Sequence, residues 1–387
     1  MDTIVLPRIC LKVDRLPTHP WIFRRSLEAP QQLPAGTIAD LVDGHGRFLA
    51  RGFWNGHARI GFRVLTRQAG EVIDAEFIQG RIAQAVELRR ERLHLDTQSD
   101  AWRVLNSEAD GLSGLIVDRY ADLLVLEYFA AGMWRLREVI EVALQQAFPG
   151  CRFYHFAERH VQKQESFDCR TPQPPEPVWI HEHKLAFRVA PGGRHKTGFF
   201  LDQRDNRARL EAWAQGRVLD LCCHSGSFAL HAARAGGDPV TGIDLDEAII
   251  QLARDNAQRN ALQVHFEQGD LFPFLEQAVQ RGQQWDTVIL DPARLTRDRA
   301  RLPQALRAYV AMNRLALLAV APGGLLLSCS CSGLVTEVDF LECLRRAAAL
   351  AKRRVTVLHS AGAAADHPFA IDVPEGRYLQ AVFCRVY

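Results

Sequence analysis

From Val178 to the end of the chain, strand-like and helix-like segments alternate, and this repeat constrains the fold more than any other feature. The apolar runs GRVLDLCC, PVTGIDL, VHFEQGD and WDTVILD are separated by segments of helical character. Such alternation is typical of a mostly parallel sheet covered by helices on both faces. GGLLLSCSCSG and RYLQAVFCRVY add later strands, and the last one could be an antiparallel edge strand. The sequence predicts a Rossmann-like α/β domain over 178–387.

The first half of the chain reads differently, and 387 residues favour two or three domains. Over 1–70, short apolar runs alternate with Gly and Pro, which predicts a small β-rich domain. Over 71–177 we expect an α+β domain. It should contain helices over Phe77–Leu95 and Met133–Ala147, a hairpin turning at Ala121–Asp122, and a Pro-rich loop or linker over Thr171–Pro177.

Composition narrows the classes of protein. No stretch reaches the roughly 18 to 20 apolar residues of a membrane helix, and the N-terminus lacks the apolar core of a signal peptide, so a soluble, cytoplasmic protein is expected. The nine cysteines are an odd number, which favours reduced thiols over a disulfide framework. No HExxH or CxxC ligand pattern occurs, so no metal site is predicted.

Charge is uneven along the chain. The net charge is only +2, but residues 1–70 hold ten Lys plus Arg against five Asp plus Glu. A GC-rich genome accounts best for the general preference for arginine over lysine. The basic first domain itself favours a nucleic-acid partner.

The turn after the first strand of the α/β domain is a candidate cofactor site, because ligands of such sheets bind at the carboxyl ends of the strands. The turn lacks GxGxxG, which disfavours NAD, whose pyrophosphate needs backbone donors. A similar turn could occur in any α/β protein. Its candidate binding residues are Asp220, Cys222, Ser225 and Gly226.

Two further acidic residues raise the specificity of this pattern. Asp244 ends the next strand, where a carboxylate can accept hydrogen bonds from both ribose hydroxyls. Asp270 ends the third strand, within reach of an adenine amino group. The alternative is that such residues only cap helices.

Several motifs together resemble a known family across the whole chain. These are HPWIF at His19–Phe23, EADGLSGLIVDRY at Glu108–Tyr120, HKTGFFLDQRDNR at His195–Arg207, SCSCSGLV at Ser328–Val335, and AADHPF with PEGRYLQ over Ala364–Gln380. The C-terminal half is similar to class I methyltransferases that use S-adenosylmethionine. The whole chain resembles the RlmI family of large-subunit ribosomal RNA cytosine-5 methyltransferases. That resemblance implies an N-terminal PUA domain, a central domain, a Rossmann-like catalytic domain, S-adenosylmethionine as cofactor and large-subunit rRNA as partner.

The sequence departs from the family pattern in two loops. The usual DPPK is here Asp291-Pro292-Ala293-Arg294, and the usual aromatic-rich turn is Cys222-Cys223-His224. The Asp-Pro pair and the cationic fourth position remain, so we expect a working pocket in which Arg294 contacts RNA.

The resemblance also implies a reaction. Carbon 5 of cytosine becomes nucleophilic only after a thiolate adds to carbon 6. Cys331 stands where related enzymes place this thiolate, and Cys329 would share its side of an extended strand. Asp291 could hold or protonate ring nitrogen 3. Packing for the cysteines and helix capping for Asp291 are the alternatives. The loop has no second cysteine to assist product release, so Cys329 or a water-linked base would serve.

The remaining candidates concern the cofactor and the RNA. Phe200 could cover the cofactor or pack in the core, and Gln203 could hydrogen-bond the cofactor. Trp21 is interpreted as a core residue. The predicted RNA contacts are Lys12, Arg24, Arg25, Lys196, Arg204 and Arg294.

Three functions remain open from the sequence. The first is cytosine-5 methylation of large-subunit rRNA by a monomer or homodimer. The second is methylation of another base or RNA through the same fold. The third is an RNA-binding assembly factor without turnover, suggested by the two altered loops.

Overall fold

The computed structural model describes residues 5–13, 15–29, 32–170, 173–192 and 198–387. Two compact units make up the chain. The first consists of Met1–Val178, Val189–Gly198 and Asp366–Pro374; the second consists of Trp179–Arg188, Phe199–Ala365 and Glu375–Tyr387. The predicted division into domains over 1–70, 71–177 and 178–387 stays a prediction.

The first unit begins with a six-stranded sheet in the order β2-β6-β5-β4-β1-β3. Its pairs are antiparallel except β1 with β4, which is parallel. Buried side chains such as Ile9, Leu41 and Phe62 form its core. The β-rich start of the chain is thus confirmed. The strands are β1 Arg8–Leu11, β2 Trp21–Phe23, β3 Leu27–Glu28, β4 Thr37–Val42, β5 Phe48–Trp54 and β6 Ile60–Thr66.

A second sheet in this unit has the order β10-β9-β8-β7. Strands β8 and β9 pair as an antiparallel hairpin around Ala121 and Asp122, as predicted. The α-helix predicted over Phe77–Leu95 ends earlier, because a π-helical turn replaces it from Leu88. The elements are α1 Ala75–Glu87, β7 Ala101–Asn106, β8 Leu115–Tyr120, β9 Leu123–Tyr128, α2 Ala131–Arg135, α3 Arg137–Ala147, β10 Arg152–Phe156 and α4 Arg159–Glu165.

Buried polar groups join the two sheets of this unit. The Trp21 indole N–H donates to Glu108 Oε1 over 2.7 Å. The Arg63 guanidinium donates to Glu165 Oε1 over 3.1 Å, and the Asn55 amide donates to Glu165 Oε2 over 3.0 Å. The HPWIF and EADGLSG motifs therefore meet at this junction. Trp21 is only partly buried and is not among the core residues of this sheet, so its interpretation as a core residue stays a prediction.

The second unit contains a seven-stranded sheet in the order β15-β14-β13-β16-β17-β19-β18. Strands β13 to β17 pair in parallel, and β19 pairs antiparallel with β17 and β18. The final strand is antiparallel, as expected, but it is inserted beside β17, and β18 is the edge strand. The strands are β13 Val218–Leu221, β14 Val240–Asp244, β15 His265–Gln268, β16 Trp285–Leu290, β17 Val320–Ser330, β18 Val355–Ala361 and β19 Gln380–Val386.

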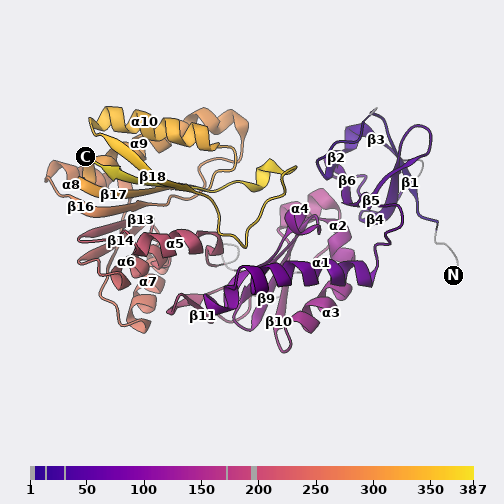
Figure 1. Cartoon of the computed structure of the whole chain (residues 1–387), viewed down its shortest axis with the longest axis horizontal. Coiled ribbons are helices and arrows are strands. Elements are labelled where there is room, and N and C mark those ends of the chain that lie inside the picture. Colours follow the sequence, from indigo (N-terminus) through magenta and orange to yellow (C-terminus); the bar gives the residue numbers. More distant parts are fainter. Residues whose placement is uncertain (1–4, 14, 30–31, 171–172, 193–197) are drawn as a thin grey trace. The chain divides into compact units, whose positions relative to one another are not determined.

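Helices cover both faces of this sheet, which confirms the predicted Rossmann-like arrangement. Figure 1 shows α8, α9 and α10 on one side of the sheet and α5, α6 and α7 on the other. Their bounds are α5 Arg204–Glu211, α6 Ser227–Arg234, α7 Glu247–Arg259, α8 Leu271–Gln280, α9 Leu302–Ala319 and α10 Glu337–Ala351.

A buried charged group fastens a β-hairpin to the start of this domain. The hairpin consists of β11 Val178–Glu182 and β12 Leu185–Val189. Both oxygens of Glu182 accept from the Arg207 guanidinium, over 2.6 and 2.7 Å, and all these side chains are fully buried. The Arg207 charge holds the pKa of Glu182 well below its usual range. Because Arg207 lies on α5, this pair also fixes the preceding LDQR segment.

Among the residues that the structure describes, no helix combines the length and the apolar character needed to span a bilayer. Nor does that part of the chain gather three or more His, Cys, Asp or Glu side chains that could hold a metal ion.

Candidate active site

The turn that follows β13 has an unusual backbone. Cys222, His224 and Gly226 all adopt the left-handed conformation, with φ of 62°, 48° and 77°. Such conformations cost free energy in non-glycine residues and cluster at ligand sites. At Gly226 a side chain would also collide, since a Cβ would lie 2.6 Å from the Phe266 ring. Gly226 is therefore required by the shape of the turn.

Two buried polar atoms at this turn have no partner among the residues that the structure describes. Asp220 is fully buried, and its Oδ2 accepts from the Ala229 N–H over 3.0 Å at the start of α6. Its Oδ1 and the Ser225 hydroxyl have no hydrogen-bond partner within the described part of the chain. Burial raises the pKa of Asp220 well above its usual range. Since buried polar groups are nearly always bonded, these two atoms indicate where a polar ligand would bind.

The acidic residues on the next two strands have backbone partners. Asp244 ends β14, and its carboxylate accepts from the backbone N–H groups of His224 (3.0 Å) and Asp246 (3.2 Å). Asp270 follows β15 and accepts from the Phe272 N–H over 2.8 Å, so it caps α8. Helix capping, the alternative interpretation, therefore accounts for one carboxylate oxygen of Asp270. A carboxylate has about four acceptor positions, so both residues keep capacity for a ligand.

Phe200 lies beside the same turn. Its side chain is 49% exposed, whereas the preceding Phe199 is buried. The Phe200 ring contacts the His224 ring edge-on, with 4.9 Å between centroids. The alternative of core packing thus does not fit Phe200, which is free to cover a ligand in the turn.

Gln203 contacts a catalytic candidate directly. It is almost fully buried, donates from Nε2 to Asp291 Oδ2 over 3.0 Å, and accepts from the Asn206 amide over 2.7 Å. Gln203 therefore orients Asp291, a role that differs from the predicted cofactor contact. Asp291 follows β16, and burial, together with the nearby Asp202 carboxylate, raises the pKa of Asp291 to about 7.

Two of the predicted phosphate contacts, Lys196 and Arg204, belong to the HKTGFFLDQR motif. Arg204 is fully buried and pairs with Asp205 Oδ1 over 3.2 Å, so the prediction that it contacts RNA phosphates is wrong in this structure. The reason is that α5 packs this side chain inward. Lys196 lies outside the described residues.

The serines of the SCSCS motif all point to one side of β17. Ser328 donates to the Asn313 amide oxygen over 2.6 Å, and Ser330 donates to the Tyr309 hydroxyl over 2.9 Å. Ser332 lies 3.0 Å from the same hydroxyl. Asn313 and Tyr309 are on α9, so this helix holds the serine side of the motif.

The intervening cysteines lie on the other side. Cys329 is fully buried, and burial together with Asp291 raises its thiol pKa well above the usual range. Cys331 is partly exposed, with its Sγ 3.7 Å from the Pro292 carbonyl, and burial raises its pKa to about 12. Both cysteines therefore share one side with Asp291, as expected from the alternation of an extended strand. Cys331 is the more accessible thiol.

Arg294 completes this side of the site. It is exposed, and its Nε donates to the Cys331 carbonyl over 3.2 Å. Sequence reasoning missed the partners that fix these loops, namely Asn206, Tyr309 and Asp202. The alternation of serine with cysteine was the one available signal, since it predicts that the serines face a polar partner.

The predicted RNA contacts of the first unit are exposed, and one of them, Arg25, lies beside an exposed aromatic ring. Lys12, Arg24 and Arg25 are all exposed. Phe23 is 39% exposed, and the guanidinium groups of Arg25 and Arg59 lie 6.0 and 5.4 Å from its ring centroid. Guanidinium planes and aromatic rings are the groups on which unpaired bases stack.

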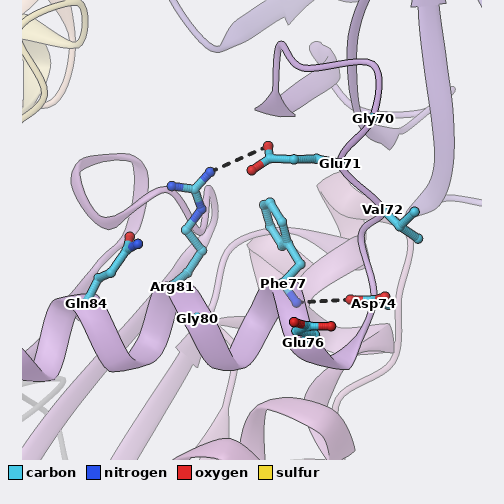
Figure 2. A pocket seen from close by; sticks show the side chains of 9 residues that line it. All are labelled: Gly70, Glu71, Val72, Asp74, Glu76, Phe77, Gly80, Arg81 and Gln84. Atoms are coloured by element: carbon cyan, nitrogen blue, oxygen red, sulfur yellow. Dashed lines mark hydrogen bonds and ion pairs between the residues drawn. The ribbon is translucent and has the colours of Figure 1, made fainter.

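A pocket of about 420 Å³ lies in the first unit, next to α1. Figure 2 shows its lining, where Arg81 points toward Glu71 and Asp74 accepts from the Phe77 N–H. Two of its carboxylates, Glu71 and Asp74, thus have partners within the protein. None of the predicted site residues lines it.

Comparisons with known proteins agree with the class that the sequence motifs resemble. A family model described as a methyltransferase domain matches residues 214–365, and one described as a PUA-like domain matches residues 17–67. A protein assigned as a methyltransferase and solved in complex with SAH aligns with a TM-score of 0.81 and 18% identity, covering 99% of this chain and 100% of that one. A protein from Streptococcus mutans, assigned as a SAM-dependent methyltransferase, aligns with a TM-score of 0.77 and 18% identity over 95% of both chains. Fold and domain matches define a methyltransferase with an attached PUA-like domain.

The relatives in sequence are more specific. The chain is 38% identical to the ribosomal RNA large subunit methyltransferase I of Tolumonas auensis, covering 97% of this chain and 98% of that protein. It is 36% identical to the protein of the same name from Aeromonas salmonicida over 95% of each. The chain therefore belongs to the ribosomal RNA large subunit methyltransferase I family, which confirms the resemblance seen in the sequence motifs.

Proposed function

We propose that this protein uses S-adenosylmethionine to form 5-methylcytosine in large-subunit ribosomal RNA, through a covalent bond between Cys331 and the base. The observation that carries the proposal is the shared side of Cys331 and Asp291, next to the β13 turn. The names of the relatives, at 36 to 38% identity, support the choice of RNA. A cytoplasmic location follows from that substrate, and a homodimer remains a prediction.

The turn residues fit the cofactor. Asp220 Oδ1 and the Ser225 hydroxyl are the unpartnered polar atoms that would meet its polar groups. Asp244 would accept from the ribose hydroxyls, Asp270 would meet the adenine, and Phe200 would cover the bound molecule. Cys222 lines the turn, where burial and Asp244 raise its pKa, so it is a neutral thiol. The cofactor supplies a methyl group on a positively charged sulfur.

The chain's own residues then activate the base. The Cys331 thiol passes its proton to a water molecule as its sulfur adds to carbon 6. The electrons of the double bond between carbons 5 and 6 then move toward ring nitrogen 3, and carbon 5 becomes nucleophilic. With a pKa of about 7, Asp291 is partly protonated near neutral pH, so it can donate a hydrogen bond to ring nitrogen 3 as negative charge builds there. Gln203 holds the Asp291 carboxyl in this position.

RNA contacts would come from both units. Arg294 lies beside Cys331 and would meet a phosphate near the target base. Lys12, Arg24 and Arg25 would bind phosphates along the first domain, where Arg47 and Arg51 are already paired with aspartates.

The cofactor assignment is tested by calorimetric titration. Asp244→Ala should weaken S-adenosylmethionine binding by roughly tenfold or more, because it removes the acceptor of two ribose hydrogen bonds of about 0.5 to 1.5 kcal/mol each. Unchanged affinity in the folded variant would refute the ribose role. A wild-type protein that binds no cofactor would favour an assembly factor without turnover.

The reaction is tested by incubating the purified protein with large-subunit rRNA and S-adenosylmethionine, followed by mass spectrometry of the nucleosides. The expected product is 5-methylcytosine at one position. Methylation at another base or another atom would overturn the cytosine-5 proposal.

A further inference from the structure

Asp202 carries a carboxylate in the proposed active site. It takes no part in the proposed addition of sulfur or transfer of the methyl group. It belongs to a 3-10 turn over Leu201–Gln203, at the end of the FFLDQR segment. Its backbone carbonyl accepts from the Ala364 N–H over 2.7 Å, and its Oδ2 accepts from the Tyr378 hydroxyl over 2.6 Å. The turn and the carboxylate are thus held from two sides.

The second carboxylate oxygen, Oδ1, has no donor in the part of the chain that the structure describes. Asp202 Oδ1 is buried and has no hydrogen-bond partner among the described residues. A buried carboxylate oxygen without a donor is costly, and such an atom needs an explanation. Tyr378 fixes the orientation of the carboxylate and leaves the lone pairs of Oδ1 open to a bound substrate.

Asp202 lies close to the reacting groups. The next residue, Gln203, donates to Asp291 over 3.0 Å. Burial raises the pKa values of both Asp291 and Cys331, and the Asp202 carboxylate adds to both shifts. The three groups therefore belong to one site.

We propose that Asp202 is the base that removes the proton from carbon 5 of the methylated cytosine. This inference rests on the proposed cytosine-5 reaction. After methyl transfer, carbon 5 carries both a methyl group and a hydrogen, and carbon 6 carries the Cys331 sulfur. Asp202 Oδ1 takes the proton, the C–H electrons form the double bond between carbons 5 and 6, and the C–S bond breaks with its electron pair on sulfur. Product and thiolate are released together.

The other candidates fit this step less well. Asp291 already accepts from Gln203 and holds a proton near neutral pH, which suits the acid at nitrogen 3. Cys329 is fully buried, and its raised pKa keeps it a neutral thiol. A neutral thiol accepts a proton poorly, so Asp202 is the better base.

The test uses Asp202→Asn with RNA that carries tritium at carbon 5 of cytosine and with a carbon-14-labelled methyl donor. Because methyl transfer precedes proton removal, the variant should accumulate a protein–RNA adduct that carries the methyl label on a denaturing gel. Tritium release should fall by about 100-fold or more, within the usual range for loss of a general base. Adding Cys331→Ala should abolish the adduct.

Three controls separate catalysis from folding. Calorimetric binding of S-adenosylmethionine by Asp202→Asn should match the wild type. Tyr378→Phe keeps the carboxylate but removes its hydrogen bond, and it should slow tritium release more mildly. Asp255→Asn makes the same substitution on α7, where the side chain contacts Gln251, and it should release tritium at the wild-type rate.

The outcomes are distinct. Wild-type tritium release by Asp202→Asn, without an adduct, would overturn the role of Asp202 and leave a water as the base. If the wild type methylates its RNA but releases no tritium, the cytosine-5 proposal itself fails, whatever Asp202 does.

Discussion

Asp291 is partly protonated near neutral pH because burial of its carboxyl group and the nearby Asp202 carboxylate raise its pKa to about 7. Ionising it would place a second negative charge in the same site. The Gln203 amide offsets only part of this cost by donating to Oδ2. Protonated Asp291 therefore stabilises the folded chain, and it is also the form that can donate a hydrogen bond to the cytosine ring.

This gives a test of stability against pH. The folded pKa of about 7 lies above the ordinary value of 3.8, so the folded state binds this proton more tightly than the unfolded state does. The contribution to stability is complete below about pH 4 and is lost as the pH rises through about 7. The free energy of unfolding of the wild type, minus that of Asp291→Asn, should fall over this window by up to about 4 kcal/mol. Urea unfolding at several pH values measures it, and a difference independent of pH would contradict the assignment.

Single residues differ in how far the sequence could predict them. Asp220, Asp244 and Asp291 could be identified because the carboxyl ends of parallel strands meet at one edge of the sheet. Asp202 was missed because it sits in an irregular turn, and its partner Tyr378 is 176 positions away in the chain. Arg204 was assigned wrongly because charge alone predicts exposure, whereas packing of α5 buries it.

At the scale of elements, periodicity predicted the strands and helices of the sheet, but not every connection. The sequence predicted that both cysteines share one side, because the chain is extended at the end of β17. The structure agrees, since the serines that alternate with them bond to α9 on the opposite side. The place of β19 beside β17 could not be read from local sequence, because strand order depends on pairing between distant segments. Likewise, no local pattern marks the π-helical turn after α1.

The turn after β13 allows a matched pair of variants. Gly226 and Gly282 both have positive φ, of 77° and 67°, but only Gly226 faces close neighbours; a Cβ at Gly282 would have nothing within 4 Å. Gly282→Ala should cost about 1 kcal/mol for the left-handed backbone alone. Gly226→Ala should cost roughly 2 kcal/mol more because it also overpacks against Phe266. Thermal unfolding compares them, and equal losses would show that the turn accommodates a side chain.

At the scale of the whole molecule, both units supply proposed RNA contacts, but the proposed reacting groups all come from the second unit. The exposed basic residues around Phe23 belong to the first unit, and the reacting groups belong to the second. This division was predictable from the charge of residues 1–70 and from the strand–helix repeat beyond Val178. The buried junction of Trp21, Arg63 and Glu165 was not, because it joins residues far apart in the sequence.

Arg24→Ala with Arg25→Ala tests this division. The double variant should bind rRNA more weakly and lower the slope of log affinity against log salt by about 1.5, since each lost phosphate contact removes roughly 0.7 to 0.9. Its affinity for S-adenosylmethionine should not change. Arg47→Ala with Arg152→Ala removes the same charge from arginines already paired with Asp43 and Asp122, and should alter the slope less. An unchanged slope in the Arg24 and Arg25 variant would show that these residues do not contact RNA.

The proposed covalent bond between Cys331 and cytosine can be trapped with a fluorinated base. In 5-fluorocytosine, carbon 5 carries a fluorine in place of the hydrogen that the reaction must remove. The adduct should therefore persist on a denaturing gel after methyl transfer. The wild type and Cys329→Ala should both form the adduct, and Cys331→Ala should not, although it still binds S-adenosylmethionine. If Cys331→Ala retains the adduct while Cys329→Ala loses it, Cys329 is the nucleophile; if the wild type methylates its RNA without ever trapping, the account of cytosine-5 chemistry is wrong.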